Sequence, residues 1–293
     1  MKNMNSKKKN GKKYAVKTAA GAMAAGILVS GMLMTPGTTA KAASEAEYTK
    51  NENVYVRMAP DGTVNGTYLV NSFTVTKDGD ITDFGEYDKI QNLTNLETIE
   101  QDKDEQTFTA DKGKFYYQGD IEKAELPWTF DITYTLDGTE VDETELAGAE
   151  GDLEILMQIR KNPAVADETF WNGYLLQVTT TLDSAFCEDI QAKGASISDA
   201  GANEQITWVV NPGTEADLKI TASVKDFEMD DISIAGAAAT DLSVSFVSDQ
   251  NEHMGKTTFI MSAEGVTIPD EEPAPVEQDQ QTGFLDKLRS LFS

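Results

Sequence analysis

The sequence predicts an all-β protein with a small N-terminal β-rich unit, an immunoglobulin-like β-sandwich and a short amphipathic helix at its C-terminus. Three observations support this fold class. Short runs of alternating apolar and polar residues recur between residues 53 and 264, and Gly, Asn, Pro or Asp separates most of them. No long amphipathic helical pattern occurs before residue 283. Regularly spaced short strands of this kind are typical of a sandwich.

The first β-rich unit is expected at residues 43–126. Two alternating runs lie on either side of the Pro-Asp-Gly sequence at 60–62, which is typical of a β-hairpin. Residues 76–108 are polar, rich in turn residues and weakly patterned, so we expect a long surface excursion there. A further short strand is expected at residues 113–120.

The sandwich is expected at residues 127–236. Its first strand alternates cleanly and places five large apolar residues on one face: Trp128, Phe130, Ile132, Tyr134 and Leu136. Four similar runs follow, at residues 153–162, 174–183, 203–213 and 216–227. The Cys…Trp…Cys spacing of antibody domains is absent. Residues 237–268 are expected to add a β-hairpin, with strands at 241–249 and 256–264, that completes a sheet.

Residues 1–42 have the organisation of a secretory signal peptide. A lysine-rich start without acids precedes an apolar run at 18–34, and Ala40-Lys41-Ala42 fits a cleavage site between Ala42 and Ala43. The alternative is an uncleaved membrane helix, for which the run is short and rich in Ala and Gly. We therefore expect export to the extracellular face of the cell membrane or the cell envelope. The long lysine-rich start is typical of Gram-positive bacteria.

The charge of the exported part excludes several classes of partner. Residues 1–42 hold eight of the chain's 24 basic residues and no acid, so 16 basic and 50 acidic residues remain, a net charge of −34. Such a surface repels nucleic acids and anionic polymers. We expect no nucleic-acid partner.

The C-terminus carries a detached apolar stripe. Residues 269–283 form an acidic, proline-containing linker, and residues 284–293 are predicted to form an amphipathic helix. Its apolar side consists of Phe284, Leu285, Leu288, Leu291 and Phe292. A helix of this length measures about 15 Å and is too short to span a bilayer. We expect it to dock on the membrane surface or on an envelope membrane protein, and the alternative is that it packs back onto the sandwich.

The sequence offers little material for catalysis or metal binding. His253 is the only histidine, and no G-x-S-x-G motif accompanies it. Cys187 is the only cysteine and is expected to be a small structural residue. The acidic stretch at 78–86 fails the calcium-loop pattern, because Asp83 occupies the position that requires Gly. No catalytic residue, cofactor or metal site is predicted.

Two aromatic residues, Phe170 and Trp171, are candidate ligand contacts. They lie in a loop flanked by Gly and Asn, where exposed rings could bind a surface polysaccharide or a protein ligand. The alternative is that they anchor the loop on the edge of the sandwich.

Several stretches together resemble a known group of envelope proteins. They are ENVYVRMAPDGTV, KGKFYYQGD followed by LPWTFDITYTLDG, DLEILMQIRKNP, DFEMDDISIAG, FVSDQNE and the final FLDKLRSLF. This combination resembles the ectodomains of Gram-positive heptad-repeat cell-envelope proteins related to the YhgE/Pip, or phage infection protein, family. The resemblance implies an envelope location and a β-rich ectodomain. The Leu-x-x-Gly coiled-coil array of those proteins is missing here, since only residues 237–245 join the flanking segments, and so are the transmembrane helices of the transporters.

These observations favour a non-catalytic exported cell-envelope protein with a structural or interaction role at the outer face of the membrane. The alternative is a freely secreted carbohydrate- or protein-binding adhesin module. An enzyme of unrecognised type is a third hypothesis.

Overall fold

The chain folds almost entirely into β-strands. The computed structural model describes residues 44–250 and 252–268, and its helices within these ranges are α1 (Glu143–Leu146) and α2 (Thr169–Gly173). Neither of these described helices has the length and apolar content that crossing a membrane requires. The all-β fold class that the sequence predicts is confirmed.

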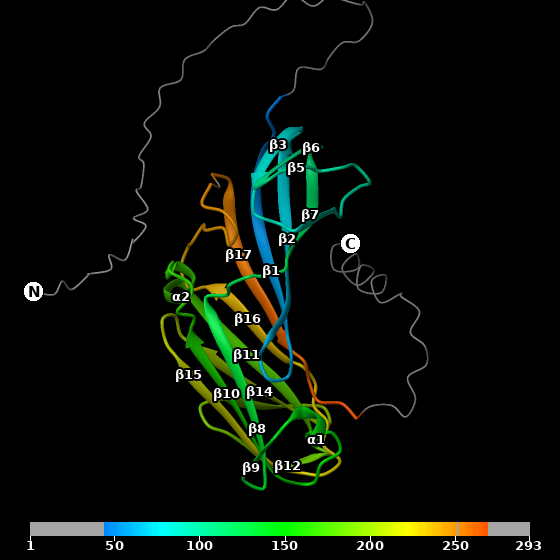
Figure 1. The fold of residues 1–293 in the computed structure, drawn as a ribbon, viewed down its shortest axis with the longest axis vertical. Coiled ribbons are helices and arrows are strands. Elements are labelled where there is room, and N and C mark those ends of the chain that lie inside the picture. Colours follow the sequence, from blue (N-terminus) through cyan, green and yellow to red (C-terminus); the bar gives the residue numbers. More distant parts are fainter. Residues whose placement is uncertain (1–43, 251, 269–293) are drawn as a thin grey trace, which may run out of the picture. The chain divides into compact units, whose positions relative to one another are not determined.

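The largest element is a nine-stranded sheet. In spatial order its strands are β13 (Ser196–Ala200), β14 (Asn203–Val210), β11 (Tyr174–Asp183), β16 (Ile232–Ala238), β17 (Met254–Ala263), β1 (Glu47–Met58), β2 (Val64–Lys77), β7 (Gly113–Ile121) and β4 (Lys89–Asn92). Neighbouring strands are antiparallel except β1 and β17, which run parallel. The first and last of the described strands therefore lie side by side in the middle of the sheet (Figure 1).

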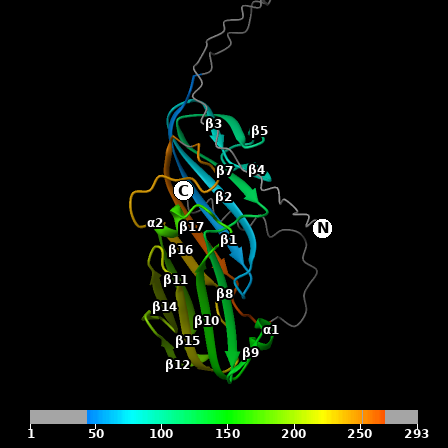
Figure 2. The same cartoon turned by 60° about the vertical axis from the view of Figure 1, so that its left-hand side comes forward.

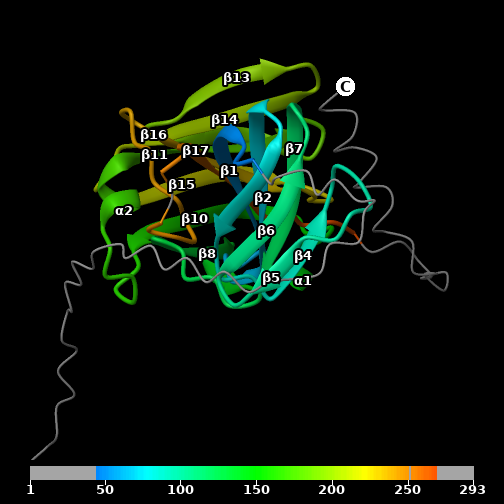
Figure 3. The same ribbon diagram turned by 90° about the horizontal axis from the view of Figure 1, so that it is seen from above.

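Two smaller sheets accompany it. The five-stranded sheet has the order β12 (Cys187–Ala192), β15 (Ala216–Val224), β10 (Gly151–Lys161), β8 (Trp128–Leu136) and β9 (Thr139–Val141). The three-stranded sheet has the order β3 (Gly79–Phe84), β6 (Glu105–Ala110) and β5 (Glu100–Asp102). Figure 2 shows β3 and β5 close to β2 and β7, and Figure 3 shows β8, β10 and β15 as a separate layer from β11, β14 and β16.

Both smaller sheets pack on the same face of the nine-stranded sheet. Phe259 of β17 is paired across the sheet with Val54 of β1, and it contacts Trp128 of the five-stranded sheet, with ring centroids 5.1 Å apart. Phe73 of β2 lies on the same face, because its partner on β1 is four residues from Val54, and it contacts Phe108 of the three-stranded sheet at 5.4 Å. Burying each Phe side chain contributes about 1.5–3 kcal/mol, so these contacts hold the layers together.

The β1–β2 turn is the hairpin that the Pro-Asp-Gly sequence predicts, and its tip is held against β8. Gly62 has a φ of +90°, and a Cβ atom there would lie 2.7 Å from the backbone oxygen of Phe130. The backbone oxygen of Asp61 accepts a hydrogen bond of 2.9 Å from the N–H of Ile132. Glycine is therefore needed at position 62 both for the left-handed conformation and for the close approach of the two sheets.

The five runs predicted within 127–236 are all strands: β8, β10, β11, β14 and β15. The predicted boundary at 126/127, however, does not separate two sheets. Strands β1 and β2 from the first segment belong to the same sheet as β11, β14 and β16 from the second, and β17 joins the two groups. The parallel pairing of β1 with β17 joins residues far apart in the sequence, so the alternation of residues within either strand gives no sign of it.

The expected surface excursion at residues 76–108 is wrong. This stretch contains β3, β4, β5 and β6. Its inward positions are shared between apolar residues, such as Ile81 and Phe108, and the buried polar residues Asp83 and Gln106. Polar residues at inward positions hide the alternation on which strand prediction depends.

The expected hairpin at 237–268 is only half correct. Residues 256–264 correspond to β17, but residues 241–249 form no strand. The apolar side chains of this segment pack against the core: Leu242, Val244, Phe246 and Val247. The alternation therefore reflects the packing of these side chains against the core, and β17 pairs with β16 and β1 instead.

Candidate functional site

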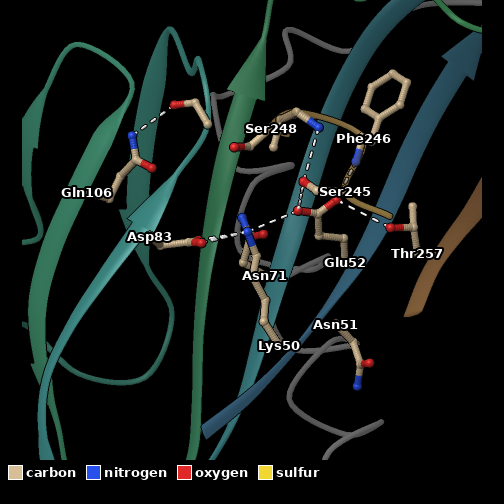
Figure 4. Close-up of polar contacts among 12 residues, drawn as sticks. Lys50, Asn51, Glu52, Asn71, Asp83, Gln106, Ser245, Phe246, Ser248 and Thr257 are labelled. Carbon is tan, nitrogen blue, oxygen red and sulfur yellow. Dashed lines mark hydrogen bonds and ion pairs between the residues drawn. The ribbon is translucent and has the colours of Figure 1, made fainter. Parts of the chain in front are cut away.

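Near the N-terminal end of β1, two charged side chains are buried in the core. The inward positions Val54 and Val56 are apolar, but the next two inward positions toward the start of β1 are Glu52 and Lys50, which have no exposed surface. The Nζ atom of Lys50 lies 3.0 Å from Oε1 of Glu52 and 2.8 Å from Oδ2 of Asp83 on β3 (Figure 4). We call Lys50, Glu52 and Asp83 the charge cluster.

Hydrogen bonds from neighbouring groups complete the charge cluster. The hydroxyl of Tyr117 on β7 donates to Oδ2 of Asp83 at 2.5 Å. Glu52 accepts a bond of 2.6 Å from the hydroxyl of Ser245 and one of 2.8 Å from the backbone N–H of Phe246. The cluster therefore ties β1 to the three-stranded sheet through Asp83 and to segment 241–249 through Glu52.

The electrostatics of the cluster fix its protonation at neutral pH. Burial disfavours the charged form of Lys50, but the carboxylates of Glu52 and Asp83 outweigh this effect and raise the pKa of Lys50 above its ordinary value. Burial raises the pKa of Tyr117 well above 10, and the neighbouring Tyr87 and Asp83 add to this shift. Lys50 is therefore charged, and Tyr117 is a neutral hydrogen-bond donor.

A cavity of about 530 Å³ lies against the segment that the charge cluster holds. Its walls are formed by residues 243–249, by Val165, Asp167, Thr169 and Phe170, and by Glu125 and Pro127. Ligand sites in proteins commonly enclose about 300–1,000 Å³ and combine apolar walls with a few polar groups. This cavity has both properties, with Phe170 and Phe246 among its apolar residues and Asp167 and Asp249 among its acids.

The two aromatic residues predicted as ligand contacts are both buried. Phe170 is 8 % exposed and Trp171 is 7 % exposed, and Phe170 packs against Phe259 with ring centroids 5.3 Å apart. The loop predicted at these positions is wrong, because both residues lie in α2. Their burial fits the alternative that they anchor this segment on the sandwich. Phe170 also lines the cavity, whereas Trp171 is not part of its wall.

The remaining residues that the sequence singles out lie apart from one another. Cys187 is buried at the start of β12, and burial raises its pKa to about 11. His253 is exposed, and its ring lies 4.4 Å from that of Tyr48. Asp83 faces Lys50, while Asp80 accepts a hydrogen bond from Thr109, so the acids of 78–86 do not converge. The predicted cleavage site at Ala42 and Ala43 and the stripe at 284–293 lie outside the described residues.

The charge cluster is a feature that sequence reasoning misses. Lys50 and Glu52 occur in a strongly acidic and polar stretch, where a solvated face is the expected environment. A signal does exist, because both residues fall on the alternation that continues through Val54 and Val56, and this register predicts that they face inward.

No family model matches the chain, and no curated protein matches it. Among solved structures, the chain is similar to the yeast delta-COP-I mu-homology domain, with a TM-score of 0.41 and 8% identity over 75% of this chain and 97% of that one. The same domain complexed with a Dsl1 WxWxV peptide gives a TM-score of 0.40 and 12% identity, again over 75% and 97%. Collagen adhesin (CNA) from S. aureus gives 0.20 and 9% identity over 74% and 93%. Similarities at TM-scores this low do not bear on function. The fold and the site define an all-β sandwich protein with a buried charge cluster beside an open cavity.

Proposed function

We propose that this protein is a non-catalytic exported cell-envelope protein with a structural or interaction role at the outer face of the membrane. One observation carries the proposal. Three buried charged groups lie inside the core, where Lys50 forms ion pairs with both Glu52 and Asp83. These charges join β1 to β3 and to segment 241–249, so they have a structural role.

The two ends of the chain supply the location in this proposal. The signal peptide at 1–42 directs export, and the apolar stripe at 284–293 docks on the membrane surface or on an envelope membrane protein. The acidic linker at 269–283 holds the strongly negative body away from an anionic membrane surface.

Cell fractionation tests the proposal. The full chain and a chain that lacks residues 283–293 are expressed in a Gram-positive host. The full chain is expected in the envelope pellet and should be released by detergent, and the shortened chain is expected in the culture supernatant. Equal amounts of both chains in the supernatant would contradict the envelope role.

The alternative is a freely secreted adhesin module that binds carbohydrate or protein, and the cavity beside Phe170 favours it. The same fractionation separates the two proposals, because a freely secreted module is found in the supernatant with or without residues 283–293. Binding at the cavity is tested with Phe246→Ala, which opens the cavity wall.

A further inference from the structure

The charge cluster brings an amine into contact with a carboxyl group inside the core. The Nζ atom of Lys50 lies 2.9 Å from Oδ1 and 2.8 Å from Oδ2 of Asp83. Because these two distances are nearly equal, Nζ faces the carboxyl carbon of Asp83 rather than a single oxygen. With ordinary carboxyl bond lengths the nitrogen and the carbon are about 3 Å apart, a separation from which groups held in place react.

The surroundings keep water away from this pair. Lys50 has no exposed surface, and Asp83 is 2 % exposed. The ring of Phe73, which is the partner of Lys50 on β2, has its centroid 6.0 Å from Nζ, and it stacks on the ring of Tyr117 at 5.8 Å. Ionised groups are costly in such a place, whereas an amide carries no charge. Burial therefore favours an amide over the ion pair and protects that amide from hydrolysis.

Glu52 is placed to move the proton that amide formation requires. Lys50 is charged at neutral pH, and an ammonium group has to lose a proton before its nitrogen can attack a carboxyl carbon. Oε1 of Glu52 lies 3.0 Å from Nζ, which is close enough for direct transfer. The hydroxyl of Ser245 and the backbone N–H of Phe246 donate to the two oxygens of Glu52 and hold its carboxylate beside the amine.

The contacts assign different roles to the two carboxylates. Nζ faces the carbon of Asp83 through both oxygens, whereas its contact with Glu52 is through Oε1. The hydroxyl of Tyr117 donates to Oδ2 of Asp83 at 2.5 Å. This donor stabilises the negative charge that Oδ2 carries when nitrogen adds to the carbon. Asp83 is therefore the group that is attacked, and Glu52 is the base.

We propose that Lys50 and Asp83 form an intramolecular amide cross-link with Glu52 as the proton carrier, and that the ion pair in Figure 4 is the arrangement before this bond forms. Glu52 takes a proton from the ammonium group, and the lone pair of Nζ adds to Cγ of Asp83. The Cγ–Oδ1 bond then breaks, and Oδ1 leaves as water with the two protons that the nitrogen has lost. Glu52 returns to its carboxylate form, and no oxidant or other reagent is consumed.

The cross-link joins two of the sheets by a covalent bond. Lys50 lies on β1 of the nine-stranded sheet, and Asp83 lies on β3 of the three-stranded sheet. With Cys187 as its single cysteine, the chain cannot form an intramolecular disulfide, the usual covalent tie of exported proteins. The proposal goes beyond the envelope role and does not depend on how the protein is retained at the cell.

The mass of the intact protein tests the proposal without any substitution. The full chain is purified in its folded form, kept at neutral pH, unfolded in acid and measured by mass spectrometry. Its mass is expected to be lower than that of its sequence by one water molecule. Trypsin does not cut after a lysine whose amine is part of an amide. The digest should therefore contain a branched peptide that joins the stretch ending at Arg57 to residues 78–89.

Two variants separate the cross-link from other losses of water. Lys50→Arg keeps the positive charge, but a guanidinium group does not give up its proton. Glu52→Gln keeps the shape of the side chain and removes the base. Both variants should have the full mass and no branched peptide. Lys77→Arg changes a lysine in the exposed pair with Glu47 and should keep the mass deficit. Circular dichroism checks that each variant is folded.

Four results would overturn the proposal. They are the full mass for folded wild type, the same mass deficit in Lys50→Arg, attachment of Lys50 to an acid other than Asp83, and a deficit retained in Glu52→Gln, which overturns the role of Glu52. The first of these identifies the cluster as an ordinary buried ion pair. It decides the matter even if neither core variant folds, because it needs only wild type.

Discussion

Replacing Lys50 by Met leaves two buried carboxylates without their cation. Met has a similar length and no charge, so the change removes the Nζ atom that lies 3.0 Å from Glu52 and 2.8 Å from Asp83. Asp83 keeps the hydroxyl of Tyr117, and Glu52 keeps Ser245 and the N–H of Phe246. Removing one partner of a buried ion pair costs about 3–5 kcal/mol, and here one lysine serves two carboxylates, so we expect the upper part of that range.

A loss of this size is a large share of the stability of an ordinary domain, which is about 5–15 kcal/mol. For a body of this length it corresponds to a fall in Tm of roughly 6–20 °C. Urea unfolding at neutral pH, followed by tryptophan fluorescence and circular dichroism, measures the difference. The matched control is Lys77→Met on β2, because Lys77 pairs with Glu47 at 3.8 Å and both side chains are more than half exposed. That change should cost less than about 1 kcal/mol.

A triple variant gives an independent check on the cause. Adding Glu52→Gln and Asp83→Asn to Lys50→Met removes the two buried carboxylates and should recover part of the loss. A cost for Lys50→Met no larger than that for Lys77→Met, or no recovery in the triple variant, would refute the reasoning.

Three further predictions follow from particular residues. Stability should fall above about pH 10, where the tyrosines of the unfolded chain ionise. Burial raises the pKa of Tyr48 to about 12 and that of Tyr117 further, so the folded state keeps protons that the unfolded chain releases. Tyrosinate absorbance should appear together with unfolding, and ionisation of all tyrosines in the folded protein would contradict this. Cys187, with a pKa raised to about 11, should resist a thiol reagent at neutral pH until urea unfolds the protein, and rapid labelling of the folded chain would be evidence against its burial. Gly62→Ala should lower the free energy of unfolding in urea by at least about 2 kcal/mol more than Gly138→Ala does. Both positions have positive φ, but only at Gly62 would the added Cβ lie 2.7 Å from a backbone oxygen. Equal losses would mean that the approach of Phe130 to the turn is unimportant.

The alternation of apolar and polar residues predicts the strands whose inward positions are apolar throughout. Strand β8 follows this rule, since Trp128, Phe130 and Ile132 are all buried and the residues between them are exposed. Strand β3 does not, because Asp83 occupies an inward position beside Ile81. The β1 positions Lys50 and Glu52 are missed for the same reason. Their burial depends on the charge of a partner on another strand, and a single strand does not contain that information.

The pairing of strands that are far apart in the sequence also cannot be predicted from the alternation within a strand. Nothing within residues 47–58 or 254–263 indicates that these segments run parallel and adjacent. For Phe170 and Trp171, which lie in α2, the sequence supports either a ligand contact or an anchor on the sandwich, and their burial favours the anchor.

The most direct test of the envelope role concerns the stripe at 284–293. Five large apolar side chains contribute roughly 7–15 kcal/mol if fully buried, and partial insertion together with the ordering of the segment reduces this to a few kcal/mol, which suffices for reversible attachment. Binding of the purified exported protein to liposomes is compared for wild type, for Leu288→Asp with Leu291→Asp, and for Ser290→Asp with Ser293→Asp, which adds the same charge outside the stripe.

The account predicts that the leucine variant loses liposome binding while its Tm stays at the wild-type value, and that the serine variant keeps most of its binding. If the leucine variant binds like wild type and its Tm falls, the stripe belongs to the fold, and the proposal of attachment to the membrane is wrong.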